Sequence, residues 1–201
     1  VLDETTNRLN DVMSGLIADG LIADNSIILY VNDGSRDATW QIIEKLCSDC
    51  KYVCGINLAS NVGHQNALMA GLETSKEIGE LAISIGADLQ DDTGVIRTMV
   101  EEFHNCNDIV YGVRKERKVD SFFKRYTANL FYTLMAKLGA SSIYNHADYR
   151  LMSKRALVQL CNFPERNLFL RGLVPLLGYN TTKVYYDRHE RFAGKSKYPF
   201  S

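Results

Sequence analysis

The feature that most constrains the fold of this chain is a repeated switch between short apolar runs and segments with helical periodicity. Near the N-terminus, apolar residues recur at helical spacing: Leu9, Val12, Met13, Leu16 and Ile17. An apolar run over 27–31 follows, and its length is that of a strand. Strands that alternate with helices favour βα units, so we predict an α/β fold with a mainly parallel central sheet flanked by helices.

The alternation continues along the chain, and its length of 201 residues suits a single domain. We expect further strands over 52–58, 81–85, 109–111 and 183–187. Helices are expected over 38–50, 67–73, 95–104, 122–138 and 168–177, with a strand and a helix within 148–160. Asp37 is a suitable N-cap for the second helix. The segment 122–138 is strongly amphipathic, so it packs either on the sheet or on a membrane surface.

Composition and charge argue against several classes of protein. The formal net charge is −1, whereas a general nucleic-acid binder carries a large positive excess, so we expect no nucleic-acid partner. No segment has the apolar length of a membrane span. The five cysteines, among them the pair Cys47 and Cys50, are an odd number, so we predict reduced thiols in the cytosol. The chain starts without methionine and stops abruptly at Ser201, so we expect a fragment of a longer protein.

Polar residues follow several of the predicted strands. Asp33, Asp88 and Arg114 each lie just past a predicted strand end. In open α/β sheets, ligands bind at the carboxyl ends of the strands, so these residues point to one site. Neither the glycine-rich dinucleotide motif nor the P-loop motif occurs in the sequence.

Two groups of charged residues suggest a phosphate-containing ligand. Asp88, with Asp91 and Asp92 close behind, is suited to Mg²⁺, which takes one or two carboxylates and fills its coordination shell with phosphate and water. The alternative is a cluster of carboxylates that cap a loop. The segment 191–197 combines a flexible glycine with four potential phosphate donors: Arg191, Lys195, Ser196 and Lys197. The alternative there is a solvated charged surface.

Six segments carry a resemblance to a known family, and they occur in family order over almost the whole chain. They are 31–39 (VNDGSRDAT), 61–67 (NVGHQNA), 87–91 (ADLQD), 111–117 (YGVRKER), 147–151 (ADYRL) and 191–198 (RFAGKSKY). With them the sequence resembles family 2 glycosyltransferases of GT-A fold, in particular the polyprenyl-phosphate glycosyltransferases related to dolichol-phosphate mannose synthase. The resemblance implies one GT-A catalytic domain, with a nucleotide-sugar-binding half over 1–112 and an acceptor-side half over 113–201.

The resemblance also implies roles for particular residues. Asp33 would contact the donor nucleotide, and Asp88 and Gln90 would lie at a divalent metal, Mg²⁺ or Mn²⁺, and at the donor diphosphate. Asp148 stands where a catalytic base or an acceptor-orienting carboxylate is expected. We expect the orienting role first, because a phosphomonoester is already mostly ionised at pH 7. Donor or acceptor phosphate would meet a further set of residues: Arg114, Arg117, Arg125, Arg191, Lys195, Ser196 and Lys197, of which Arg117 and Arg191 are also catalytic candidates.

Three features depart from the family pattern. The family's opening strand, with its V-P-x-Y-N-E signature, is absent from this chain. The D-x-D motif reads Gly86-Ala87-Asp88, so one metal-site carboxylate is missing. Ser60 and Asn32 replace a common arginine and a frequent aspartate. Gly86 could mean weaker metal binding, compensation by Asp91 or Asp92, or lost activity.

These observations lead to one expected function and three alternatives. We expect an inverting glycosyltransferase that moves a sugar from a UDP- or GDP-sugar to a polyprenyl phosphate at the cytoplasmic face of a membrane, with a homo-oligomer as an open possibility. One alternative within the family is a polysaccharide or glycan acceptor. Another is a non-catalytic relative that binds a nucleotide-sugar or a partner subunit, for which Gly86 is the main support. A nucleotidyltransferase is the least favoured, because the glycine-rich, lysine-containing loop of such enzymes is absent from this sequence.

Overall fold

The structure, a computed structural model, describes residues 1–115, 146–164 and 169–188. The strands are β1 (Ile28–Asn32), β2 (Val53–Asn57), β3 (Leu81–Ser84), β4 (Ile109–Arg114), β5 (His146–Ser153) and β6 (Thr181–Tyr186). The helices are α1 (Leu2–Ala18), α2 (Thr39–Asp49), α3 (His64–Ile78), α4 (Ile96–His104), α6 (Lys154–Cys161) and α7 (Leu170–Leu176), with a 3₁₀ turn η1 (Thr93–Val95) before α4. The predicted α/β alternation is confirmed over these residues, and the predicted helix over 122–138 lies outside them.

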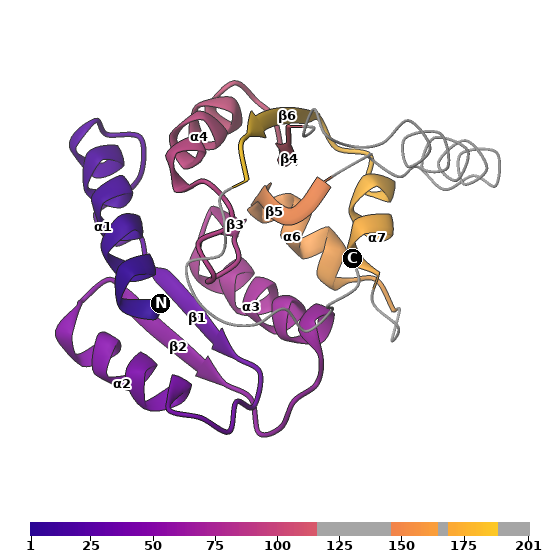
Figure 1. The fold of residues 1–201 in the computed structure, drawn as a ribbon. Helices are drawn as coiled ribbons and strands as arrows, with labels where there is room; N and C mark the ends of the chain where they lie inside the picture. Colours follow the sequence, from indigo (N-terminus) through magenta and orange to yellow (C-terminus); the bar gives the residue numbers. More distant parts are fainter. Residues whose placement is uncertain (116–145, 165–168, 189–201) are drawn as a thin grey trace, which may run out of the picture.

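The strands form two hydrogen-bonded sheets rather than one. β1 pairs in parallel with β2, and the second sheet has the order β3-β5-β4-β6. In that sheet β4 and β6 are parallel, whereas β5 runs antiparallel to both β3 and β4. Helix α3 contacts both β1 and β3 and so links the two sheets (Figure 1). The strands are therefore mainly parallel in direction, as predicted, with β5 reversed between its two neighbours.

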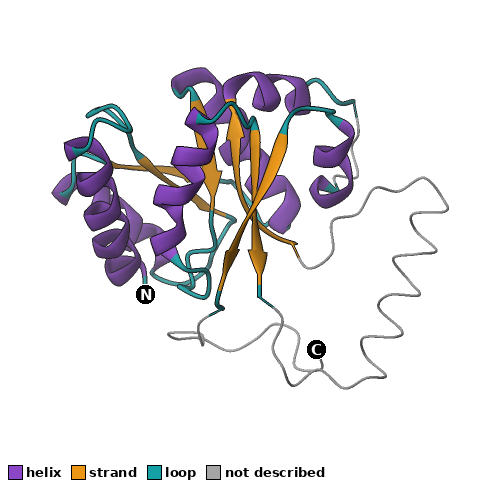
Figure 2. Cartoon of the chain, turned by 90° about the horizontal axis from the view of Figure 1, so that it is seen from above, coloured by secondary structure: helices purple, strands orange, loops and turns teal. Residues whose placement is uncertain are grey.

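Helices cover both faces of the strands (Figure 2). One buried cluster joins apolar residues of α1, α2 and α4 to one side of the strands, including Leu16, Ile43 and Met99. A second cluster joins α3, α6 and α7 to the other side, including Leu72, Leu157 and Val174. The apolar residues of β4 are buried along the strand because it lies between β5 and β6 and under helices on both faces.

Several local expectations can be compared with the structure. Helix α2 begins at Thr39, and Asp37 caps it from one residue before the N-cap by accepting the backbone N–H of Thr39 at 3.0 Å. All five cysteines lie within the described residues and are free, as predicted, with Cys47 and Cys50 at the end of α2. Buried Asn32 donates to the side chain of Asn57 at 2.8 Å, so an uncharged pair is satisfied where an aspartate is frequent in the family. In the part of the chain that the structure describes, no helix is both long and apolar enough to cross a membrane.

Candidate functional site

Strand β5 places two polar clusters on opposite faces of the sheet. Because successive side chains of a strand alternate between faces, Asp148 and Arg150 point one way and Tyr149 points the other. β5 is antiparallel, so its first residues lie at the carboxyl ends of β3 and β4. Arg150 pairs with Ser84, the last residue of β3, and with Tyr111 in the middle of β4. The Ser84 hydroxyl donates to the carbonyl oxygen of Asp148 and holds this end of the strand. Asp148 and Arg150 therefore lie near the carboxyl ends of β3 and β4, the region where the sequence predicts a ligand site.

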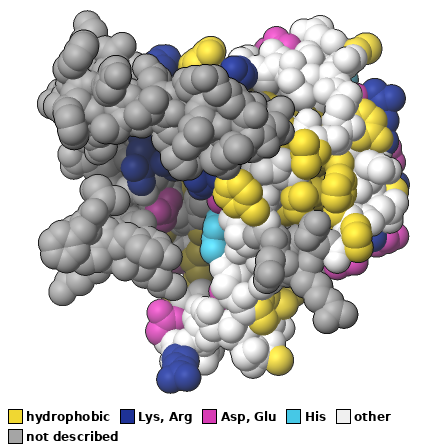
Figure 3. Space-filling model, turned by 90° about the vertical axis from the view of Figure 1, so that its right-hand side faces the viewer, with side chains coloured by type: hydrophobic (Ala, Val, Ile, Leu, Met, Phe, Trp, Pro, Cys, Tyr) yellow, Lys and Arg dark blue, Asp and Glu magenta, His cyan; other side chains and the backbone are white. Residues whose placement is uncertain are grey.

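We call Asp148, Arg150, Arg171 and His64 the Asp148 cluster. Arg150 Nη2 donates to Asp148 Oδ1 at 2.8 Å, and His64 Nε2 lies 2.9 Å from Oδ2. Arg171, on α7, donates from Nε to Oδ1 and from Nη2 to Oδ2, both at 3.3 Å. One carboxylate thus faces two guanidinium groups and an imidazole. Figure 3 shows a histidine side chain on one face of the molecule, close to acidic and basic side chains.

The charges of the cluster fix the protonation of its members. Burial would raise the pKa of Asp148, but hydrogen bonds from His64 and Arg171, together with the charges of Arg171 and Arg150, outweigh it and hold that pKa far below its usual value. In turn, the hydrogen bond to Asp148 raises the pKa of His64. Asp148 is therefore a stable anion at neutral pH and a weak proton acceptor.

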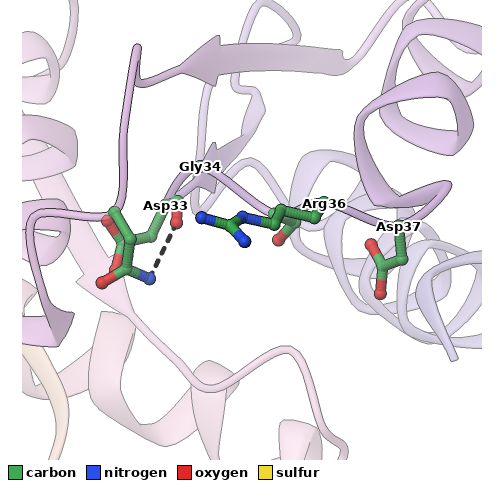
Figure 4. Close-up of a pocket in the computed structure, with 6 residues that line it drawn as sticks. Asp33, Gly34, Arg36 and Asp37 are labelled. Carbon is green, nitrogen blue, oxygen red and sulfur yellow. Dashed lines mark hydrogen bonds between the residues drawn. The ribbon is translucent and has the colours of Figure 1, made fainter.

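Asp33 lines an open pocket that follows β1. The pocket has a volume of about 550 Å³ and is lined by Asp33, Gly34, Ser35, Arg36, Asp37 and Asn61 (Figure 4). The carboxylate of Asp33 accepts the backbone N–H of Val62 at 2.7 Å, and the Asn61 side chain donates to the Asp33 carbonyl at 3.0 Å. Gly34 has φ +60°, and a Cβ there would lie 2.5 Å from the Asn61 nitrogen, so this close approach of two loops requires glycine.

The segment 61–64 joins the Asp33 pocket to the Asp148 cluster. Val62 donates to Asp33, and His64, two residues later, begins α3 and contacts Asp148. The pocket and the cluster are therefore neighbouring parts of one region.

The loop after β3 carries the predicted metal residues. A Cβ placed on Gly86 would lie 3.3 Å from Asp88 Oδ1 and 3.6 Å from Asp91 Oδ2, so both carboxylates border the position of the missing one. Gln90 Oε1 accepts a hydrogen bond from Arg188 Nη2 at 2.5 Å. Asp92 caps η1 by accepting the Gly94 N–H at 2.8 Å, which is the loop-capping role that the sequence left open.

A second polar cluster, the Asp91 cluster, lies on the other face and consists of Asp91, Arg114, Tyr186 and Tyr149. Asp91 Oδ1 accepts from the Tyr186 hydroxyl at 2.5 Å and from Arg114 Nη2 at 3.1 Å. Arg114 Nε also donates to the Tyr186 oxygen at 3.1 Å, and Tyr149 donates to the Asp92 carbonyl at 2.9 Å. Burial and the nearby Asp91 charge raise the pKa of both tyrosines, so both stay protonated. Asp91 itself is only 7% exposed.

The oxygen donors near Gly86 fit part of a metal site. Asp88 and Asp91 supply hard carboxylate oxygens of the kind that Mg²⁺ and Mn²⁺ prefer. Within 1–115, 146–164 and 169–188, no group of three or more His, Cys, Asp or Glu is arranged to hold a metal ion. A metal at this loop would therefore take its remaining ligands from phosphate and water.

Five of the predicted site residues lie in the described part of the chain. Asp33 lines the pocket, Asp88 and Gln90 follow β3, Asp148 centres one cluster and Arg114 belongs to the other. The remaining predicted site residues lie outside the described residues: Arg117, Arg125, Arg191, Lys195, Ser196 and Lys197.

Sequence reasoning missed Arg171 and gave no role to His64, Arg150 or Tyr186. His64 and Arg150 stand inside two of the resembling segments, so their position was a signal that could have been used. Arg171 lies 23 residues after Asp148 and Tyr186 lies 95 residues after Asp91, the carboxylates that they contact, and no local pattern marks either residue.

Comparisons with known proteins bear on this arrangement. A sequence profile described as "Glycosyl transferase family 2" matches residues 3–161. A Bacillus subtilis protein described as uncharacterized glycosyltransferase YkoT is 55% identical over 199 residues, which are 99% of this chain and 59% of that protein. The bactoprenol glucosyl transferase of Shigella phage SfX is 39% identical over 172 residues, 85% of this chain and 56% of that protein. The chain thus spans less than two thirds of these relatives.

Two solved structures resemble this fold more distantly. Residues 1–349 of Staphylococcus aureus TarS align with a TM-score of 0.49 and 17% identity, covering 81% of this chain and 51% of that one. The bifunctional IspDF from Campylobacter jejuni aligns with a TM-score of 0.48 and 10% identity, covering 81% and 49%. Neither similarity says anything about activity.

Proposed function

The chain belongs to glycosyl transferase family 2, and on this premise we propose that the whole protein transfers a sugar from a UDP- or GDP-sugar to a polyprenyl phosphate. Support for the acceptor comes from the similarity to a protein named bactoprenol glucosyl transferase. Support for the donor comes from the pocket at Asp33 and the carboxylates near Gly86, which lie next to carboxyl ends of strands. The cytoplasmic face of a membrane, where such a lipid acceptor is presented, is the proposed location.

The observation that carries the proposal is the environment of Asp148. An acceptor hydroxyl would need a base that can take up its proton, whereas Asp148 is held as an anion by Arg150, Arg171 and His64. A phosphomonoester needs no such base, because at pH 7 it is mostly a dianion. The cluster suits an anionic acceptor and an orienting role for Asp148.

The proposed reaction balances without proton transfer. A phosphate oxygen of the acceptor forms a bond to the anomeric carbon of the sugar. The bond from that carbon to the diphosphate oxygen breaks, and the nucleoside diphosphate leaves with the electron pair. Attack opposite the leaving group inverts the anomeric configuration. The protein contributes by positioning the two anions and by offsetting their charge.

Asp88 and Gln90, with the Asp91 carboxylate near Asp88 at Gly86, would hold a divalent metal beside the donor diphosphate. When bound, Mg²⁺ or Mn²⁺ supplies Lewis-acid stabilisation of the leaving diphosphate. Because the described residues place only two carboxylates beside Gly86, metal affinity should depend strongly on the donor.

A non-catalytic relative is the second candidate, and Gly86 is the observation that favours it. Replacing Gly86→Asp would place a third carboxylate beside Asp88 and Asp91. For a catalytic protein we expect tighter Mn²⁺ binding, by ~10-fold or more, with transfer already present in the wild type. Gly86→Asn is the matched control, because it adds similar volume without the charge. Activity that appears only in Gly86→Asp would favour the non-catalytic candidate.

The experiment that tests the proposal starts with the full-length protein. Calorimetric titration with UDP- and GDP-sugars, with and without Mn²⁺, should show metal-dependent binding of one nucleotide. Product analysis with the bound donor should then show transfer to a polyprenyl phosphate and none to a saccharide. Transfer to the saccharide instead would mean that the acceptor is a glycan and not a polyprenyl phosphate. No binding of any donor would overturn the transferase proposal.

A further inference from the structure

We infer that His64 and Arg171 together bind the phosphate of the acceptor, and that Asp148 acts as the residue that positions both. The inference rests on the proposed function, because it names the part of the site that binds the acceptor. Neither His64 nor Arg171 follows from the strand-end pattern of the sequence; their role comes from the contacts that α3 and α7 make with β5.

The donors of Arg171 are only partly used. A guanidinium carries five N–H groups, and in the described residues Asp148 receives hydrogen bonds from Nε and Nη2 of Arg171. The side chain is 46% exposed, so its outer edge reaches solvent. Such an edge can bind two oxygens of a phosphate in the fork geometry that arginine favours.

His64 offers a second donor at the same place. Its Nε2 faces Asp148, its side chain is 72% exposed, and among the described residues Nδ1 has no hydrogen-bond partner. Nδ1 can donate to an anion only when the ring is protonated, and the hydrogen bond to Asp148 favours that form. His64 is also the first residue of α3, whose N-terminus has no side-chain cap, so the helix dipole adds to the attraction for an anion.

Arg150 explains why the cluster keeps an excess of positive charge. It is 1% exposed and shares Asp148 with Arg171, so a single carboxylate offsets two guanidinium groups. Its Nε is buried without a hydrogen-bond partner, although Nη1 and Nη2 donate to the Leu170 carbonyl and to Asp148. The charged groups that face His64 within the described chain are Asp148, Arg171 and Asp33. A bound phosphate would offset the positive charge of the two guanidinium groups that Asp148 alone does not neutralise.

The test uses the full-length chain and three variants: Arg171→Gln, His64→Gln and, as a matched control, Arg155→Gln. Arg155 is also an exposed arginine paired with an aspartate, Asp108, but at the other end of β5. Calorimetry measures binding of geranyl phosphate and, separately, of UDP and GDP. We expect Arg171→Gln to weaken geranyl phosphate binding ~10- to 100-fold and His64→Gln ~10-fold, as for hydrogen bonds to charged groups. Nucleotide binding and the Arg155→Gln control should stay unchanged.

A pH series separates binding by His64 from a structural role. Above about pH 7 the phosphate is already a dianion, so its own charge no longer changes. Wild-type affinity for geranyl phosphate should therefore fall as the pH rises through the raised pKa of His64, whereas His64→Gln should show a flat profile. A flat wild-type profile would overturn the role of His64.

Three other outcomes distinguish a failure of this inference from a failure of the proposed function. If both variants bind geranyl phosphate as the wild type does, the inference fails even when transfer is normal. If they lose UDP or GDP instead, the cluster belongs to the donor and the inference also fails. If the wild type shows no transfer, yet geranyl phosphate and inorganic phosphate both shift the His64 ring signals by NMR, the phosphate site stands and the proposed function fails.

Discussion

The two polar clusters flank the same strand and use the same chemistry, but they differ in what their donors can reach. In the Asp91 cluster, Arg114 and Tyr186 donate to the buried Asp91 oxygen and Arg114 also donates to Tyr186, so the donors point at one another. In the Asp148 cluster, Arg171 and His64 have exposed edges beyond their contacts with the carboxylate. The cations therefore differ in their access to solvent: the Arg114 side chain is 29% exposed, against 46% for Arg171 and 72% for His64.

Access of the donors to solvent distinguishes a structural ion pair from a binding site. A buried carboxylate whose donors are all used contributes to folding, because removing it leaves buried donors unsatisfied. A carboxylate that holds exposed cations positions them for a ligand. We therefore expect changes in the Asp91 cluster to appear mainly in stability, with an effect on transfer only where they also remove the Asp91 oxygen beside Gly86. Changes in the Asp148 cluster should appear in transfer.

The largest effect on stability is expected for Asp91→Ala. It leaves Arg114 without its carboxylate and Tyr186 without its acceptor in a buried place. The free energy of unfolding should fall by about 3–5 kcal/mol, as for a broken buried pair. Urea denaturation followed by circular dichroism measures it. A loss below about 1 kcal/mol would mean that this cluster does not stabilise the fold.

Asp148→Asn should separate the two clusters most clearly. Asparagine keeps one oxygen to accept from Arg150 but lacks the charge that holds Arg171 and His64. The rate of sugar transfer to polyprenyl phosphate should fall ~100-fold or more, as when a group that positions the reactants is lost. The free energy of unfolding should fall less than in Asp91→Ala. Equal losses of stability with normal transfer would contradict the distinction.

Tyr186→Phe is a smaller change in the Asp91 cluster. The change removes the hydroxyl that donates to Asp91 at 2.5 Å and keeps the ring that packs edge-to-face on Tyr149. We expect a loss of about 1–3 kcal/mol, the cost of a buried acceptor that loses a partner. Transfer measured well below the melting temperature should stay near that of the wild type. A selective loss of transfer would instead place Tyr186 in the binding site.

The smallest effect is the pH dependence of stability from the exposed pair of His64 and Asp148. The pKa of His64 is raised in the folded state, so its stabilising contribution is present at low pH and disappears as the pH rises through that pKa. Because the imidazole is largely exposed, the contribution should be only about 0.2–1 kcal/mol. The difference in unfolding free energy between wild type and His64→Gln should be larger at about pH 6 than at about pH 9. A larger difference at the higher pH would contradict the ion pair.

Much of the fold was predictable because its signals are local. Apolar periodicity in 9–17 and 95–104 and the apolar run of β4 follow from the side chains themselves, and the structure confirms helices and a strand there. The reversed direction of β5 was not predictable, because strand pairing is decided by contacts between distant segments. The same holds for the separation of β1–β2 from the other strands.

For the site, the sequence alone predicts three of the candidate carboxylates, because Asp33, Asp88 and Asp148 stand in segments typical of the family. The cationic partners of Asp148 follow from the packing of distant elements. His64 and Asp148 are 84 residues apart and come together because α3 packs against β3, the strand that pairs with β5. Arg171 reaches the same carboxylate from α7. Packing also makes the donors to Asp91 contact one another, whereas Arg171 and His64, which contact Asp148, remain exposed to solvent. Local pattern fixes residue type and element, but burial and charge neighbours arise only when distant elements pack together.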